Sequence, residues 1–124
     1  MDILELKTGQ KLNDEQSFFT KVVNVFSNIY IDDINNHLTT REVEFLYCAF
    51  RAIRDGRRDI LSKDVVSKYF TSFGGKKQRV QVYLAPIVRK LWLFENAGEY
   101  FISGKIEELI KTKEVNFQFL LKFN

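Results

Sequence analysis

A run of thirty residues without a carboxylate occupies the middle of the chain. Residues 65–94 contain no Asp or Glu, although charges of both signs are mixed elsewhere in the sequence. The run contains six basic residues: Lys68, Lys76, Lys77, Arg79, Arg89 and Lys90. Uncompensated Lys and Arg side chains on one surface are suited to hold the phosphate groups of a nucleic acid. The plainer alternative is that these residues form the solvated face of an amphipathic helix.

The residues that carry most enzyme chemistry are scarce. The chain has one His, His37, and one Cys, Cys48, which lies in the apolar stretch "FLYCAF" where a buried thiol is expected. The acidic residues Asp32 and Asp33 are adjacent, so their side chains would not converge on one face of a helix. The sequence contains no P-loop, GxGxxG, HExxH or GxSxG motif. We therefore expect a binding protein that is not an enzyme and uses no metal and no cofactor.

Size and composition are typical of one globular domain. The 124 residues, 45% of them hydrophobic and 28% charged, are enough to bury a core without disulfides or a metal. No apolar run approaches the roughly 18 residues of a membrane span, and the mixed start "MDILELKTGQ" does not resemble a secretory signal. We expect residues 1–124 to form a single domain in the cytoplasm, or in a virion if the protein is viral. The Asn-, Lys- and Phe-rich composition would also suit a phage or plasmid protein.

Two helices are predicted in the first half of the chain. Residues 14–30 place Phe18 and Phe26 on one apolar helical face. In "LTTREVEFLYCAFRAIRDG", Thr39 and Glu42 fit the S/T-x-x-E capping box that begins a helix. The final glycine of that segment stands where a C-terminal glycine would end the helix.

A short helix, a glycine turn and a basic helix are predicted next. The segment "LSKDVVSKYF" predicts a helix of about two turns, and "TSFGG" contains two glycines that can adopt positive φ in a turn. Residues 76–90 then place Val80 and Leu84 at helical spacing, with Leu91 continuing the apolar pattern. Pro86 is incompatible with a regular helix through its position. We expect a helix that is kinked near Pro86, and the alternative is a helix that begins at Pro86.

The last part of the chain combines β-structure with a C-terminal arm. The segment "WLFENAGEYFIS" predicts a hairpin whose turn is "ENAG". Residues 105–124 then predict a short amphipathic helix and an alternating apolar strand. The predicted fold class is therefore mainly α with a small β-hairpin.

Four motifs in this order resemble a winged helix-turn-helix domain over about residues 38–104. "LTTREVEFLYCAF" is similar to the first helix of many bacterial winged-helix regulators, and "LSKDVVSKYF" is similar to their second. "VQVYLAPIVRKLWLF" resembles the recognition helix with its exit, and "GEYFIS" resembles the second strand of the wing. The resemblance implies a winged helix-turn-helix with an added N-terminal helix and a C-terminal helix and strand. The chain departs from the family at Leu91, where regulators usually carry Gly, at Pro86, and in a short wing without the usual Arg.

The resemblance also implies double-stranded DNA as the partner of a small transcriptional or replication regulator. The basic helix would lie in the major groove with its first residues at the base edges. Those positions are Lys76, Lys77, Gln78, Arg79 and Gln81. Three further residues would lie nearer the phosphates: Lys68, Ser72 and Arg89. Because winged-helix folds also join proteins, the alternative is a structural or adaptor protein, such as a virion or connector component or a polymerase- or clamp-associated factor.

Two other segments suggest protein partners. Phe18 and Phe26 are predicted either as core residues or as the seam of a homodimer formed through the N-terminal helix. The C-terminal "QFLLKF", with Gln118, Leu121 and Phe123, resembles the loose peptide by which replication proteins dock on a sliding clamp. An ordinary strand or arm that packs on the domain or on a second subunit explains the same pattern.

Overall fold

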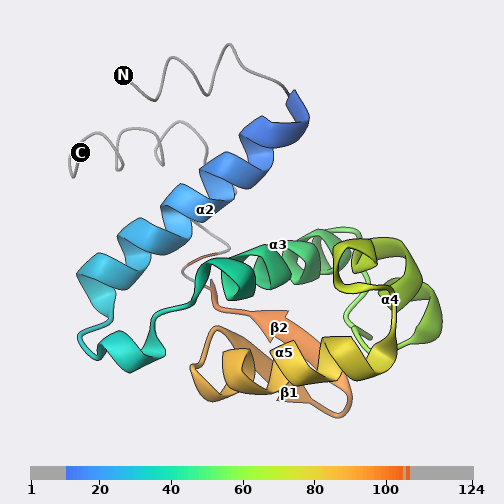
Figure 1. Ribbon diagram of the computed structural model, residues 1–124. Helices are drawn as coiled ribbons and strands as arrows, with labels where there is room; N and C mark the ends of the chain where they lie inside the picture. Colours follow the sequence, from blue (N-terminus) through green and yellow to red (C-terminus); the bar gives the residue numbers. More distant parts are fainter. Residues whose placement is uncertain (1–10, 105, 107–124) are drawn as a thin grey trace. The chain divides into compact units, whose positions relative to one another are not determined.

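The computed structural model describes residues 11–104 and 106, with side chains from residue 15 onward (Figure 1). Its helices and strands are α2 (Lys11–Tyr30), α3 (Thr40–Arg54), α4 (Lys63–Tyr69), α5 (Lys77–Arg89), β1 (Leu93–Asn96) and β2 (Glu99–Ile102). This part of the chain is therefore mainly α with a β-hairpin that packs on helices, as predicted. Helices followed by an antiparallel hairpin are compatible with a winged-helix arrangement. Apart from Ile106, the predicted C-terminal arm (105–124) lies outside the described residues.

The chain divides into two compact units, and α2 belongs to a different unit from residues 35–103. The predicted N-terminal helix is confirmed, although it begins at Lys11 and not near residue 14. Phe18 and Phe26 are buried, as are their neighbours on the same helical face. Folding of the whole chain as one domain stays a prediction.

Both ends of α3 are fixed by the local signals that predicted them. Thr39 and Glu42 form the complete capping box: the Thr39 hydroxyl accepts from the Glu42 N–H, and the Glu42 carboxylate accepts from the Thr39 N–H. Beyond the other end, Gly56 has a φ of 88°, and its N–H donates to the carbonyl of Ile53. The next N–H, that of Arg57, reaches back to Ala52, which completes a glycine-ended helix terminus.

The helix α5 follows α4 through a compact turn. Thr71–Phe73 form a single 3-10 turn, and Gly74 and Gly75 both have positive φ, as the sequence predicted. The helix then runs from Lys77 to Arg89 and includes Pro86. The alternative of a helix that begins at Pro86 is therefore wrong, whereas a bend at this residue stays a prediction. Pro86 has no N–H to donate, so α5 lacks one main-chain hydrogen bond at this residue.

Leu91 does not continue the apolar face of α5. Its φ is 68° and its side chain is 66% exposed, because the helix has already ended at Arg89. The Leu91 N–H donates to the carbonyl of Val88, and the Trp92 N–H donates to that of Ile87. These two bonds form the same type of helix terminus that Gly56 forms after α3, here with a leucine in the left-handed position.

The hairpin has a tighter turn than the sequence suggested. Strands β1 and β2 pair antiparallel, with Leu93 opposite Ile102 and Asn96 opposite Glu99. The turn is therefore Ala97-Gly98 alone, with φ of 53° and 82°, and the first two residues of the predicted "ENAG" turn are the end of β1. Two positive φ values in a two-residue loop match the twist of the paired strands.

The core of residues 35–103 lies between α3 and the elements packed around it. Helix α3 contacts α4, α5 and β2, and β1 contacts α5. The fully buried large side chains of this unit are Phe45, Leu46, Ile60, Phe70, Phe73, Ile87, Trp92 and Leu93. The loop between α3 and α4 also reaches the hairpin, because the Tyr100 N–H donates to the carbonyl of Arg58 at 2.9 Å. The guanidinium of Arg58 lies over the Phe101 ring, 4.8 Å from its centroid.

Candidate nucleic-acid interface

The predicted DNA-contacting residues are all exposed, and they lie on consecutive elements of one unit. Lys68 is in the last turn of α4, Ser72 is in the 3-10 turn, and Lys76 is the N-cap of α5. The remaining residues lie along α5: Lys77, Gln78, Arg79, Gln81 and Arg89. Helices α4 and α5 contact each other, so the turn carries Ser72 and Lys76 between two packed helices.

The positive charges of these residues are largely uncompensated, although Lys68 acts on the Asp55 carboxyl and lies over the Tyr69 ring. Within the described part of the chain, no ion pair involves Lys68, Lys76, Lys77, Arg79 or Arg89. The basic residues that do form ion pairs in this unit lie on α3, in the α3–α4 loop and at the end of α5: Arg41, Arg54, Arg57 and Lys90. Five exposed cations without a carboxylate partner leave a local excess of positive charge along α5 and the end of α4.

Lys90 is the one member of the basic run that is not part of this surface. Its side chain is only 14% exposed, and its ammonium group lies 2.8 Å from the Glu42 carboxylate and donates to the carbonyl of His37. Burial would raise the pKa of Glu42, but hydrogen bonds from Lys90 and the Thr39 N–H outweigh burial, so that the pKa is lowered. Lys90 therefore joins the end of α5 to the start of α3. Trp92 adds a second link, because its indole N–H donates to the carbonyl of Asn36.

Arg41 holds the turn that leads into α5, and the sequence did not single it out. Its guanidinium lies 3.8 Å from the centroid of the Phe73 ring and donates to the carbonyl of Ser72 at 2.7 Å. It also pairs with Glu44 one turn along α3, at 3.2 Å. The signal in the sequence is the (i, i+3) spacing of Arg41 and Glu44, which indicates a helix pair but does not reveal the contact with the turn.

An aromatic cluster beneath the turn positions α5 against α3. The Phe45 ring lies 4.8 Å from Phe70, 5.3 Å from Phe73 and 5.9 Å from Tyr83, measured between ring centroids. Phe73 also meets Tyr83 edge-on at 4.9 Å. Beside this cluster the Ser72 hydroxyl lies 3.9 Å from the Cys48 sulfur. Burial raises the pKa of the Cys48 thiol, as expected for an apolar neighbourhood.

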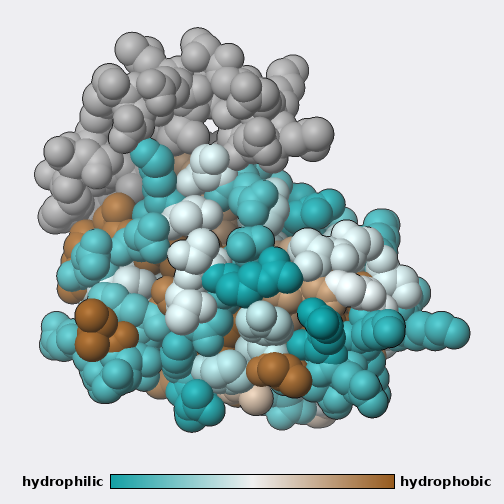
Figure 2. Space-filling view, viewed as in Figure 1, coloured by the Kyte–Doolittle hydropathy of each residue, from teal (hydrophilic) through white to brown (hydrophobic). Residues whose placement is uncertain are grey.

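The outward face of α5 combines amide, apolar and basic side chains. Val80, Leu84 and Ile87 are buried. Successive helical residues are turned by about 100° around the helix axis. The side of α5 opposite the buried residues is therefore formed by four residues whose spacings along the chain are four, three and four. These are Gln78, Val82, Ala85 and Arg89. The Val82 side chain is 70% exposed, and it is a candidate contact residue that the sequence patterns did not single out. In the view of Figure 2, separate hydrophobic side chains stand among hydrophilic ones.

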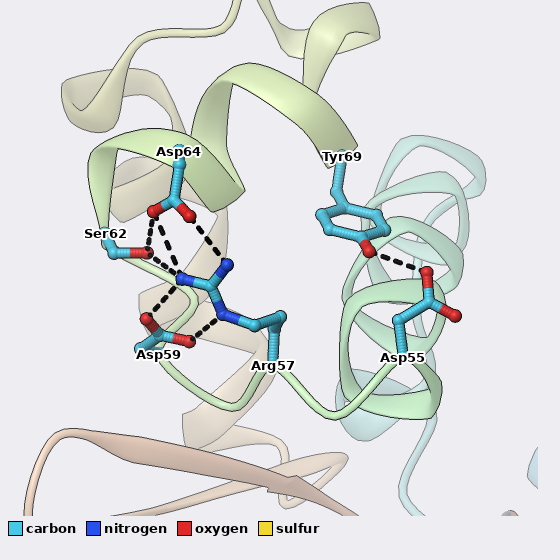
Figure 3. A network of polar contacts seen from close by, with 6 residues as sticks. All are labelled: Asp55, Arg57, Asp59, Ser62, Asp64 and Tyr69. Carbon is cyan, nitrogen blue, oxygen red and sulfur yellow. Dashed lines mark hydrogen bonds and ion pairs between the residues drawn. The ribbon is translucent and has the colours of Figure 1, made fainter.

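The arginine-rich loop before α4 is occupied by internal contacts (Figure 3). The Arg57 guanidinium donates to both oxygens of Asp59, at 3.0 and 2.7 Å, and to both oxygens of Asp64, at 2.6 and 3.1 Å. Hydrogen bonds from Arg57 hold the pKa of both carboxyls below the usual range. Nearby, the Tyr69 hydroxyl donates to Asp55 at 2.6 Å. These contacts join α3 to α4, so Arg57 stabilises the unit and does not enlarge the basic surface.

The hairpin tip carries the opposite charge. Glu95 and Glu99 are exposed, and residues 93–102 include no Lys or Arg. Glu95 also accepts a hydrogen bond from the Gly98 N–H at 2.8 Å, which closes the turn. An acidic tip does not favour contact with a phosphate backbone.

The predicted partner-binding residues lie elsewhere. Phe18 and Phe26 are buried within the single chain, and a homodimer stays a prediction. Gln118, Leu121 and Phe123 fall outside the described residues.

Residues 11–104 and 106 show neither a metal site nor a membrane-spanning helix. No group of three or more His, Cys, Asp or Glu side chains is placed to hold a metal ion there. None of the helices in that part of the chain has the length and apolar character that crossing a bilayer requires. The chain matches no family model, no curated protein and no solved structure.

Proposed function

We propose that the protein binds double-stranded DNA, with α5 in the major groove, and acts as a small transcriptional or replication regulator. The observation that carries the proposal is the set of five exposed cations on α4, α5 and its N-cap, none of them in an ion pair within the described part of the chain. Charges that are already paired have little to offer a phosphate, whereas these break no ion pair within the described residues when they approach one; Lys68 alone would give up a contact with the Tyr69 ring, 5.2 Å from its ammonium group. The role is binding without catalysis.

The arrangement of α5 is suited to a groove. A major groove about 12 Å wide admits one α-helix, and α5 is a thirteen-residue helix whose outward face has no aromatic side chain that would obstruct it. In this pose Gln78 faces the base edges, where an amide can pair with adenine through two hydrogen bonds, and Gln81 lies at the side of that face. Lys68 and Arg89, on α4 and at the far end of α5, reach the phosphates on either side.

The test is salt-dependent binding to random-sequence duplex DNA, measured by fluorescence anisotropy. If each of the five cations neutralises one phosphate of a random duplex, log K falls against log[salt] with a slope of roughly −4.5. Replacing Lys76, Lys77 and Arg79 together with Gln is expected to abolish most of the binding and to reduce the slope by about 2.7.

A matched control distinguishes the effect of this surface on DNA affinity from the effect of net charge. Replacing Lys21, Arg51 and Arg54 with Gln removes the same formal charge from α2 and α3. The control variant is expected to keep most of the affinity and nearly the whole slope. Equal binding by the two triple variants would contradict the proposal.

The second candidate function is a structural or adaptor role in which the unit binds another protein. It is favoured by Leu91 and Phe94, which are 66% and 46% exposed on either side of the start of β1. Exposed apolar residues next to an acidic hairpin tip suit a protein partner better than DNA. Such a protein would show no salt-sensitive binding to a random duplex, so the same titration decides between the two functions.

A further inference from the structure

We propose that Val82 contacts the 5-methyl group of a thymine, so that the DNA target contains an A·T pair beneath the middle of α5. The inference rests on the proposed function, because it needs α5 to lie in the major groove. Beyond DNA binding itself, it names thymine as a base that α5 selects and Val82 as the residue that selects it.

The first step is the position of Val82 on α5. It lies opposite the buried Val80, Leu84 and Ile87, in the middle of the outward face between Gln78 and Arg89. A helix that enters the groove with its buried side toward α3 presents this residue to the floor of the groove.

The second step is that the fold does not need a valine at this position. The side chain is 70% exposed, so it contributes little to the core. A β-branched residue also favours a helix less than Ala, Lys or Gln does, so helix formation does not explain it. The adjacent outward position, Ala85, is small enough to let the α5 backbone approach the bases.

The third step is the chemistry of the partner. Gln78 and Arg79 lie one turn before Val82, Ala85 and Pro86 lie one turn after it, and the cations along this helix form no ion pair among the described residues. The ligand must therefore combine dense negative charge with an apolar spot in a groove that accepts a helix. In duplex DNA that spot is the thymine 5-methyl group, which projects into the major groove.

The spacing to Gln78 makes the target more specific. The two residues are four positions apart, about 6 Å along the helix axis, which is roughly two base-pair steps. An adenine paired with Gln78 and a thymine methyl at Val82 would therefore lie about two steps apart.

The experiment compares thymine with uracil, which differ by the methyl group alone. A duplex is first selected from a random-sequence library with the wild-type protein and then remade with deoxyuridine replacing one thymine at a time. Uracil at one position is expected to weaken wild-type binding about fourfold, because burial of one methyl-sized group contributes about that factor to the affinity. Uracil at the other positions is expected to change the affinity little. Val82→Ala, which removes both γ-methyl groups and keeps only the shorter Cβ methyl, is expected to show a clearly smaller preference for thymine than the wild-type protein. Val82→Thr, which keeps one methyl group, is expected to retain a preference for thymine.

The outcomes separate this inference from the proposed function. A selected duplex whose binding is insensitive to every uracil substitution, or a thymine preference that is undiminished in Val82→Ala, overturns the role of Val82 and leaves DNA binding intact. If the wild-type protein binds no duplex, both ideas fail together. A protein partner at Val82 would give that last result.

Discussion

The carboxylate of Glu42 lies 2.8 Å from the ammonium group of Lys90, a residue 48 positions further along the chain. The same oxygen accepts the Thr39 N–H at 2.9 Å, so one atom caps α3 and holds the end of α5. The two side chains are only 10% and 14% exposed. Removing one partner of such a pair leaves the other charge in a poorly solvated position.

The first prediction follows from that contact. Glu42→Gln keeps an acceptor for the Thr39 N–H but removes the ion pair with Lys90, and we expect the free energy of unfolding to fall by about 3 kcal/mol. Urea denaturation followed by circular dichroism measures the change. The matched control is Glu44→Gln, which removes the half-exposed pair with Arg41 and should cost less than about 1 kcal/mol. Similar losses of unfolding free energy in the two variants would show that the Glu42–Lys90 pair contributes no more to stability than the half-exposed pair does.

The pH dependence of stability has a definite sign. The folded state lowers the pKa of Glu42 from its ordinary value of 4.5, so the unfolded chain binds the proton more readily. The resulting stabilisation is complete above that ordinary value and is lost as the pH falls through the folded pKa. We expect the urea midpoint to decrease on acidification below about pH 4.5, and to decrease less steeply in Glu42→Gln. A midpoint that rises on acidification would contradict this prediction.

Leu91 gives the third prediction, because it occupies a left-handed position with its side chain 66% exposed. Leu91→Gly relieves a backbone cost of about 1–2 kcal/mol, of which about 0.5–1 kcal/mol is offset by the greater freedom of Gly in the unfolded chain. We expect a net stabilisation of roughly 0.5–1 kcal/mol in urea denaturation. Ala85→Gly, inside the helix, is expected to destabilise by about 1 kcal/mol. If both glycines destabilise the protein, Leu91 is not under backbone strain.

The features that the sequence predicted are those with local causes. The capping box of Thr39 and Glu42 needs four consecutive residues, and Gly74 and Gly75 take the positive φ that glycine permits. The hairpin also follows from a short apolar run on each side of a turn. Such signals locate the helices and the hairpin before any tertiary contact is known.

Some features could not be predicted from the sequence. They depend on contacts between residues far apart in the chain, or they occur where an unusual residue occupies a position that another residue type normally holds. Lys90 looked like one more cation of the basic run, and only the fold brings it to Glu42. Leu91 looked like an apolar helix residue because the position that ends α5 does not carry the usual Gly. The exposure of Val82 depends on which side of α5 packs against α3, and the apolar pattern through Pro86 did not mark that residue as outward.

The last prediction concerns Arg41 and the turn that precedes α5. Arg41 stacks on Phe73 and donates to the carbonyl of Ser72 at the same time, a combination that depends on its planar guanidinium. Arg41→Lys keeps the charge but cannot make both contacts, so we expect the 3-10 turn to open more often. The Gly75 N–H, which donates to the carbonyl of Phe70 at 3.0 Å, should then exchange with solvent faster.

Amide hydrogen exchange of Gly75 measures this opening, and duplex affinity shows whether it matters for binding. The control is Arg51→Lys, because Arg51 lies over the Tyr69 ring, 5.9 Å from its centroid, but makes no hydrogen bond to the turn among the described residues. We expect Arg41→Lys to weaken DNA binding severalfold while Arg51→Lys does not, since only the first change alters how Lys76 and Lys77 are presented. If Gly75 exchange is unchanged in Arg41→Lys, Arg41 does not hold the turn. Any loss of affinity would then have to come from a direct contact of Arg41 with DNA.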